Sequence, residues 1–245
     1  MAASKTKFDA YTRRARYLPM LIVLAPCSLL STVLAAKFSL AIGVLIGPLM
    51  ALGLPYWLSQ VGRDQGKRKE PDLFKLWGGK PTTVRLRHRD QTINVHTKAR
   101  YHTAGQRLLP TLQFPAANDE AADPRAADAI YEAFGDLLRD RTRDARKFPL
   151  VFEELTNYGF RRNLWGWKSF AVALSATVLL LLGGLLVLAF RTGTAPTLPL
   201  IAAIVLDAGL LGFWLISINP SWVRIAADAY AERLLESSSH FLQGS

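Results

Sequence analysis

Hydrophobic residues are gathered into four long runs along the chain. The runs cover residues 18–36, 38–58, 170–190 and 198–218, and each is close to the roughly 20 residues that an α-helix needs to cross a hydrocarbon core. The first two runs are adjacent, and so are the last two, which predicts two helical hairpins. We therefore expect an all-α membrane protein with four transmembrane helices.

A hydrophilic segment, residues 61–168, separates the two hairpins and is large enough for a small domain. Thr97 is a suitable N-cap for one helix, Asp123–Pro124 predicts the start of a second, and a third is expected to begin near Pro149 and run into the third apolar run. No segment here is rich in strand-forming residues. The inserted domain is therefore expected to be mainly helical.

Positive charges beside the apolar runs predict the topology. Lysines and arginines are frequent before the first run, after the second, before the third and after the fourth, whereas the two expected hairpin turns hold only Lys37 and Arg191. The positive-inside rule then places both termini and the insert in the cytoplasm. The first run also has the basic start of a secretory signal, but the second run follows at once and favours a spanning helix.

The chain is thus divided into five parts. These are a basic cytoplasmic N-terminus (1–17), a first hairpin (18–60), a cytoplasmic ligand-sensing domain (61–168), a second hairpin (169–218) and a cytoplasmic C-terminal amphipathic helix (219–245). The last part begins near Pro220, and its apolar stripe predicts packing within its own subunit.

One carboxylate, Asp207, lies near the middle of the fourth run. A charged Asp at the centre of a bilayer costs ~3 kcal/mol or more, so this side chain should face protein or water. In one interpretation it lines a pore or ion path formed by several copies of the helix. In the other it is a buried Asp that is hydrogen-bonded to a neighbouring Ser or Thr.

The inserted domain is divided by charge. Residues 63–107 hold 12 Lys or Arg and 4 Asp or Glu, whereas residues 118–144 hold 8 acidic and 4 basic residues. Arginine forks bind phosphates, and aromatic residues stack on bases, so a nucleotide or oligonucleotide is a natural ligand for the basic half. Anionic lipid headgroups or internal salt bridges are the alternatives. The candidate ligand-binding residues are Arg85, Arg87, Arg89, Lys98, Arg100 and His102.

The sequence gives little support for catalysis. His88, His96 and His102 have no metal-ligand spacing, and the His-Arg-Asp triplet at 88–90 has no glycine-rich loop to accompany it. The single cysteine, Cys27, lies inside the first apolar run. We therefore expect no enzyme activity, no catalytic residue, no metal and no cofactor other than a nucleotide ligand.

Four motifs carry a resemblance to a known group of proteins. The segments LWGGKPTT (76–83), RHRD (87–90), TKARYH (97–102) and KFPLVFEELTNYGFRRNLWG (147–166) resemble bacterial four-span membrane effectors of antiphage defence. The chain is similar in this respect to the membrane effector of the Hailong system and to four-span effectors of CBASS.

The resemblance implies a homo-oligomeric channel of the bacterial inner membrane, plausibly a tetramer. It implies gating by the product of a linked nucleotidyltransferase, which is a short single-stranded DNA oligomer that closes the channel or a cyclic oligonucleotide that opens it. Opening would depolarise the membrane and stop growth of the infected cell.

A gating hypothesis follows from the segment that leads into the third run. Phosphates bound by the arginines would shift residues 147–168, and the shift would reach the membrane through Tyr158, Arg161, Arg162 and Trp165. The main alternative is a membrane-anchored adaptor or scaffold that recruits a cytoplasmic partner and conducts no ions. A small transporter is weakened by the absence of a repeated broken-helix pattern.

Overall fold

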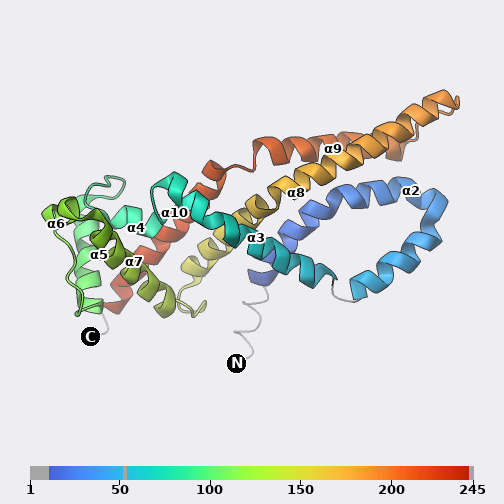
Figure 1. Ribbon diagram of the computed structural model, residues 1–245. Helices are drawn as coiled ribbons and strands as arrows, with labels where there is room; N and C mark the ends of the chain where they lie inside the picture. Colours follow the sequence, from blue (N-terminus) through green and yellow to red (C-terminus); the bar gives the residue numbers. More distant parts are fainter. Residues whose placement is uncertain (1–10, 52–53, 243–245) are drawn as a thin grey trace. The chain divides into compact units, whose positions relative to one another are not determined.

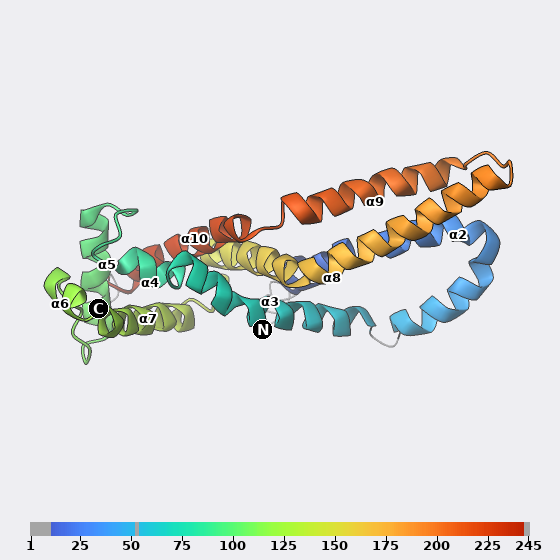
Figure 2. The same cartoon turned by 45° about the horizontal axis from the view of Figure 1, so that its top comes forward.

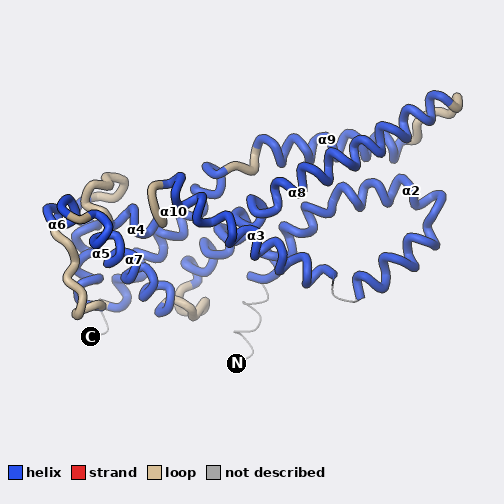
Figure 3. Tube along the Cα trace, in the orientation of Figure 1, coloured by secondary structure: helices blue, strands red, loops and turns tan. Residues whose placement is uncertain are grey.

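The computed structural model describes residues 11–51 and 54–242, and within them the side chains of all residues except 35–51 and 54–55. These residues form helices and loops without a strand (Figure 3), which confirms the all-α fold. The helices are shown in Figure 1 and are η1 (Thr12–Tyr17), α2 (Leu18–Ala51), α3 (Leu54–Trp77), α4 (Pro81–Leu86), α5 (Val95–Leu108), α6 (Ala117–Ala122), α7 (Pro124–Arg141), α8 (Pro149–Arg191), α9 (Leu198–Ile216), α10 (Pro220–Glu236) and η2 (Ser237–Phe241).

Three stretches of helix among the described residues are long and apolar enough to cross a membrane. They are Thr12–Leu34, the helix Pro149–Arg191 and the helix Leu198–Ile216, and they are compatible with a membrane protein. The expected second span, residues 38–58, has most of its side chains outside the described residues. A fourth span therefore stays a prediction.

The expected turn at Lys37 is not a break in the helix, since α2 is helical from Leu18 to Ala51. Lys37 is a single polar residue between two apolar runs, and Lys is a good helix former. Neither Gly nor Pro adjoins it to end the helix. In Figure 1 and Figure 2 the ribbon of α2 curves round along its length, and the first hairpin stays a prediction.

The chain divides into two compact units, each described by itself. The insert unit comprises Glu70–Tyr158 and Arg224–Ser245, and the apolar unit comprises Ala10–Lys69 and Gly159–Val223. Helices α3, α8 and α10 contribute residues to both units. The insert unit contains most of the hydrophilic segment that was expected to form a domain, together with the C-terminal part of the chain.

In the apolar unit, α8 and α9 lie side by side, as both Figure 1 and Figure 2 show. On α8, Ala171, Ser175, Val178 and Leu182 are spaced by three or four residues and are all buried, so they form one helical stripe. The opposite sides of both helices carry large exposed apolar residues, which suit a lipid environment better than water. These exposed residues include Phe170, Leu180, Leu188, Phe190, Leu198, Val205, Leu206 and Ile216.

A close crossing between α3 and α8 also belongs to the apolar unit. A Cβ atom added at Gly166 would lie 2.5 Å from the backbone nitrogen of Gly66, and one added at Gly66 would lie 2.7 Å from Oδ1 of Asn163. The Lys69 ammonium donates to the Gly166 carbonyl at 3.1 Å. The Asn163 amide donates to the Ala15 carbonyl at 2.6 Å, which links α8 to η1. The absence of side chains at the two glycines allows this backbone approach.

The core of the insert unit is formed by α5, α7 and the C-terminal helices. Tyr131, Phe134 and Leu138 of α7 are fully buried and pack with Tyr101 of α5 and Leu235 of α10. This confirms that the amphipathic stripe of α10, which begins at Pro220 as expected, packs within its own chain.

Two helix starts were predicted from N-cap residues, with different results. Asp123 caps α7, since its Oδ1 accepts from the backbone nitrogens of Arg125 and Ala126 at 3.1 and 3.0 Å, as predicted. The Thr97 prediction for α5 is wrong. Asn94 is the cap and accepts from the backbone nitrogen of His96 at 2.9 Å, so that Thr97 lies inside the helix. Both residues are good caps, and the upstream one is used.

The α3–α8 crossing leads to a test of stability. We expect Gly166→Ala to lower the free energy of unfolding by about 1–3 kcal/mol, because the added methyl group overlaps the Gly66 backbone. Thermal unfolding of the detergent-solubilised chain measures the change. Gly183→Ala on the same helix is the matched control, since no atom lies within 4 Å of its added Cβ. Equal melting temperatures for the two variants would contradict the proposed close packing.

Candidate functional site

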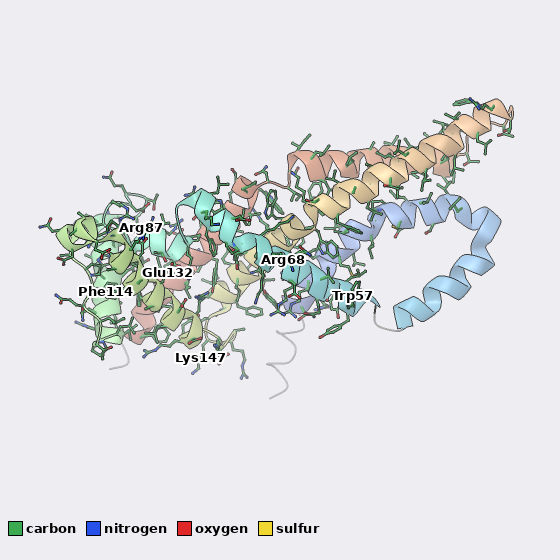
Figure 4. The ribbon with its side chains drawn as sticks, viewed as in Figure 1. Trp57, Arg68, Arg87, Phe114, Glu132 and Lys147 are labelled. Atoms are coloured by element: carbon green, nitrogen blue, oxygen red, sulfur yellow. The ribbon has the colours of Figure 1, made fainter. Side chains whose placement is uncertain are left out.

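The predicted ligand-binding residues lie in the insert unit, on three neighbouring segments. Arg85 is in α4, Arg87 and Arg89 follow its end, and Lys98, Arg100 and His102 are on α5. The structure gathers most of them around residues 86–90, because Lys98 and His102 both bond to the backbone of that segment. Figure 4 shows the Arg87 and Glu132 side chains in this unit.

Arg87 and Arg89 form salt bridges with the acidic half of the insert. Arg87 makes a bidentate pair with Asp128, with Nε–Oδ1 and Nη2–Oδ2 distances of 2.8 and 2.7 Å, and also donates to the Gly78 carbonyl. Arg89 donates from Nη1 to Glu120 Oε1 at 3.1 Å. These contacts are the internal salt bridges that the sequence left open as an alternative. A phosphate ligand would have to compete with them.

Arg85 and Arg100 differ from this pair. Arg85 Nη1 lies 3.6 Å from Glu232 Oε2 of α10, and the arginine side chain is largely buried. Arg100 is exposed, and its guanidinium carbon lies 5.9 Å from the centre of the Tyr101 ring. Arg89 and Arg100 are exposed, whereas Arg85 and Arg87 are partly buried. Phosphate binding by the six predicted residues therefore stays a prediction.

Lys98 and His102 hold the 86–90 segment in place. Lys98 is only 5% exposed, and its ammonium donates to the carbonyls of Arg87 and Asp90. Burial lowers its pKa, and the carboxylates of Asp90 and Glu120 oppose that shift. His102 Nε2 lies 2.7 Å from the Leu86 carbonyl oxygen, so this nitrogen donates. Burial also lowers the pKa of His102, against the Leu86 bond.

Glu120 is the acidic centre of this arrangement, and its role was not predicted from the sequence. The side chain is 2% exposed, and its oxygens accept from the His88 backbone at 2.6 Å, the Tyr131 hydroxyl at 2.9 Å and Arg89. Burial by itself raises the pKa of Glu120, but these hydrogen bonds outweigh it and hold the pKa below its usual value. The ionised carboxylate therefore stabilises the fold of the insert unit.

A cavity of about 180 Å³ lies elsewhere in the insert unit. The Tyr158 hydroxyl donates to Glu70 Oε1 at 2.5 Å, and the Tyr158 and Tyr230 rings are parallel, with an interplanar angle of 6° and centroids 6.3 Å apart. The lining residues are Glu70, Phe74, Lys80, Pro81, Thr82, Arg139, Tyr158, Ala227, Tyr230, Ala231 and Leu234.

This cavity was not predicted from the sequence. Of the four proposed gating residues, Tyr158 is in its wall. Tyr230 is on α10, for which the sequence predicts only an apolar stripe that packs within its own subunit. A mixture of Tyr, Lys and Arg could have drawn attention to the site, but its members, Lys80, Arg139, Tyr158 and Tyr230, are between 19 and 72 residues from one to the next along the chain.

The other three proposed gating residues lie in the apolar unit. Arg161 donates from Nη1 to the Trp222 carbonyl at 2.8 Å, and its guanidinium lies 4.7 Å from the Trp222 ring centre. Arg162 is buried and donates to Asn163 Oδ1 at 3.4 Å. The ring of Trp165 has the ammonium groups of Lys69 and Lys168 at 5.8 and 5.6 Å from its centre. Each of these side chains thus links α8 to a neighbouring segment or residue of the same unit.

Asp207 is fully buried inside the apolar unit, on the side of α9 that faces α8. Ser175 of α8 is also fully buried and lies near the carboxylate. The Ser175 hydroxyl interacts with the Asp207 carboxylate as a weak hydrogen-bond donor, and among the described residues neither side chain has a hydrogen bond of ordinary distance and angle. One apolar cluster, which includes Leu182 and Leu200, packs on one side of this pair along the helices, and another, which includes Trp214, packs on the other. Asp207 and Ser175 thus form a polar layer between two apolar layers.

The Glu120 contacts lead to a prediction about pH. A carboxyl group whose folded pKa is depressed stabilises the fold above its unfolded pKa, here 4.5, and this stabilisation is lost as the pH falls through the lower folded value. We expect Glu120→Gln to cost about 2–4 kcal/mol at neutral pH, because an amide NH₂ would face the hydrogen-bond donors. The variant should also lose part of the acid sensitivity of unfolding.

Unfolding followed by tryptophan fluorescence between pH 3 and 7 measures both effects. Glu132→Gln is the matched control, since Glu132 is a half-exposed partner of Lys80 and should contribute at most about 1 kcal/mol. Equal stability of the two variants, or an unchanged pH dependence in Glu120→Gln, would contradict the role assigned to Glu120.

The insert unit therefore holds a salt-bridged basic cluster and a cavity with aromatic and charged walls, and the apolar unit holds a buried polar layer. No protein-family model matches the chain, and no curated protein or solved structure matches it. The contacts described above are therefore the basis for assigning a function.

Proposed function

We propose that the chain forms a homo-oligomeric ion channel, a tetramer, in the bacterial inner membrane and that a nucleotide or oligonucleotide bound to its cytoplasmic insert controls the channel. The three apolar helices support membrane lipid as a partner. The cavity and the basic residues support a ligand of this kind. In this proposal the ligand is a short single-stranded DNA oligomer or a cyclic oligonucleotide made by a linked nucleotidyltransferase. The open channel depolarises the membrane in antiphage defence, as the sequence resemblance implies.

The polar layer formed by Asp207 and Ser175 is the observation that carries the proposal. Buried polar groups in proteins usually have hydrogen-bond partners of good geometry. Among the described residues, Asp207 has only a weak hydrogen-bond interaction with the Ser175 hydroxyl, and neither side chain has a hydrogen bond of ordinary distance and angle. Intramembrane carboxylates are costly and mark ion or proton pathways more often than other sites. A passing cation or water molecule would supply the missing contacts.

The continuity of α8 supports coupling between the ligand and the polar layer. This one helix includes Tyr158, in the wall of the cavity, and Ser175, near Asp207. A hydrogen-bonded helix transmits a rotation or shift along its axis without a flexible loop between the two residues. Arg161, Arg162 and Trp165 lie between them, and their contacts with Trp222, Asn163 and two lysines would have to change during the transition.

Ionic current across a planar bilayer tests the proposal. Purified chain should conduct ions, and short single-stranded DNA or a cyclic oligonucleotide should change the current, with the sign showing whether the ligand opens or closes the channel. Asp207→Asn should lower cation conductance or cation preference, because it removes the only carboxylate of α9.

Two further substitutions on α8, each of which removes one hydroxyl group, provide a second test variant and a control for this experiment. Ser175→Ala should change conductance in the same direction as Asp207→Asn. Thr177→Ala should not, because Thr177 is exposed and its hydroxyl bonds to the Ala173 carbonyl of its own helix at 2.8 Å. Single-channel behaviour that is identical in wild type, Asp207→Asn and Ser175→Ala would assign Asp207 a purely structural role.

A membrane-anchored adaptor that conducts nothing is the second candidate. The observation that favours it is the complete burial of Asp207 within a single chain, which keeps the carboxylate away from any surface that several copies could share. Correctly inserted protein that gives no current under any of these conditions would favour the adaptor over the channel.

A further inference from the structure

The cavity walled by Tyr158 and Tyr230 has features that the salt-bridged arginine cluster does not have. We propose that it binds a single base of the nucleotide ligand, with the adjacent phosphate at Lys80 and Arg139. This inference rests on the proposed function and deepens it, since it moves the expected ligand site from the arginines of residues 85–100 to a different part of the insert unit.

The aromatic wall suits a planar ring. Tyr158 and Tyr230 are parallel within 6°, and Phe74 also lines the cavity. A base placed against one of these rings would extend an existing stack, and every base has a face that can stack in this way. Ala227 and Ala231, one helical turn apart on α10, have small side chains and leave space beside Tyr230. The wall is thus flat and apolar on one side.

The size of the cavity favours one ring system. Its volume of about 180 Å³ slightly exceeds the roughly 150 Å³ of an engineered cavity that holds one benzene ring. A whole nucleotide with its sugar and phosphate is larger. The base would therefore occupy the cavity, and the sugar and phosphate would lie at its mouth.

Two cations are available for that phosphate. Lys80 and Arg139 both line the cavity, and each is paired with a partly exposed carboxylate, Glu132 and Asp136 respectively. Surface pairs of this kind are weak, so a doubly or singly charged phosphate can replace the carboxylates. Arg87, in contrast, is held by a bidentate pair with Asp128 and by the Gly78 carbonyl, and its side chain is 12% exposed. A phosphate can therefore displace the carboxylate partners of Lys80 and Arg139 more easily than the partner of Arg87.

Glu70 gives the cavity a hydrogen-bond acceptor. Its Oε1 accepts from the Tyr158 hydroxyl at 2.5 Å, and carboxylate oxygens accept hydrogen bonds of the kind that the exocyclic amino group of a base donates. A base bound in this way would contact Tyr158 and Glu70 together. Tyr158 belongs to α8, so the site would place the ligand in direct contact with the helix that includes Ser175.

Binding of short single-stranded DNA to the full chain in detergent tests the inference. The probe is a fluorescent DNA oligomer, and an abasic oligomer of equal length is the matched ligand, because it has the same phosphates without bases. We expect the abasic oligomer to bind at least about fivefold more weakly to the wild type, as stacking of one base is worth that much or more.

Variants of the wall and mouth separate the two parts of the site. Tyr230→Leu should weaken binding of the DNA oligomer about tenfold and reduce its advantage over the abasic one, whereas Tyr230→Phe keeps the ring and should bind like the wild type. Arg139→Gln should weaken both oligomers. Arg143→Gln is its matched control, since Arg143 also pairs with an Asp three residues earlier but does not line the cavity.

The outcomes distinguish this inference from the proposed function. If the wild type binds DNA and responds to it in the bilayer, but Tyr230→Leu and Arg139→Gln bind equally well, the ligand-controlled channel stands and the cavity site is wrong. Equal binding of abasic and normal oligomers by the wild type would also overturn the base site. If the folded wild type binds neither DNA nor a cyclic oligonucleotide, both the proposed ligand and the cavity site are wrong.

Discussion

A single uninterrupted helix, α8, has to satisfy two different environments along its length. Its first turns bury Val151 and Tyr158 in the insert unit, and its later turns bury Ala171 to Leu182 against α9 and α2 in the apolar unit. A helix can do both only if its buried stripe keeps the same helical period while the exposed side changes from polar to apolar. Much of the remaining structure depends on this stripe, since both cores include it.

Salt bridges between the basic and acidic halves of the insert determine which of its cations are available to a ligand. The chain has a net charge of +11, yet Arg87 and Arg89, two of the arginines predicted to bind phosphate, are paired with carboxylates of α7 and α6. The buried Glu120 carboxylate offsets the positive charge of Arg89, which lies in an arginine-rich segment of the sequence. A ligand-binding role is then easier to assign to cations in weak, exposed pairs. For this reason the cavity near Lys80 and Arg139 gains importance over the cluster.

The features that could be predicted from the sequence are those set by residues close together in the chain. The caps and prolines at Asp123, Pro149 and Pro220 mark helix starts because their effect is confined to one helical turn. The Arg87–Asp128 pair spans 41 residues, and the cavity joins Glu70 to Tyr230, so both depend on how helices pack rather than on local pattern. Asn94 was missed because Thr97 is an equally acceptable cap. Whether Asp207 serves ion conduction is a matter of chemistry that no local pattern determines.

The tryptophans near the ends of the apolar helices have a consequence for membrane depth. The partly exposed Trp165 precedes the apolar part of α8, the partly exposed Trp222 follows the end of α9, and Lys168 bonds to the Ile218 carbonyl. Indole rings and lysines prefer the boundary between headgroups and hydrocarbon. From Phe170 to Phe190 the helix rises by roughly 30 Å, which equals the hydrocarbon thickness of an average bilayer. Membrane thickness and lipid composition would therefore act on α8, the helix that also includes Tyr158 of the cavity wall.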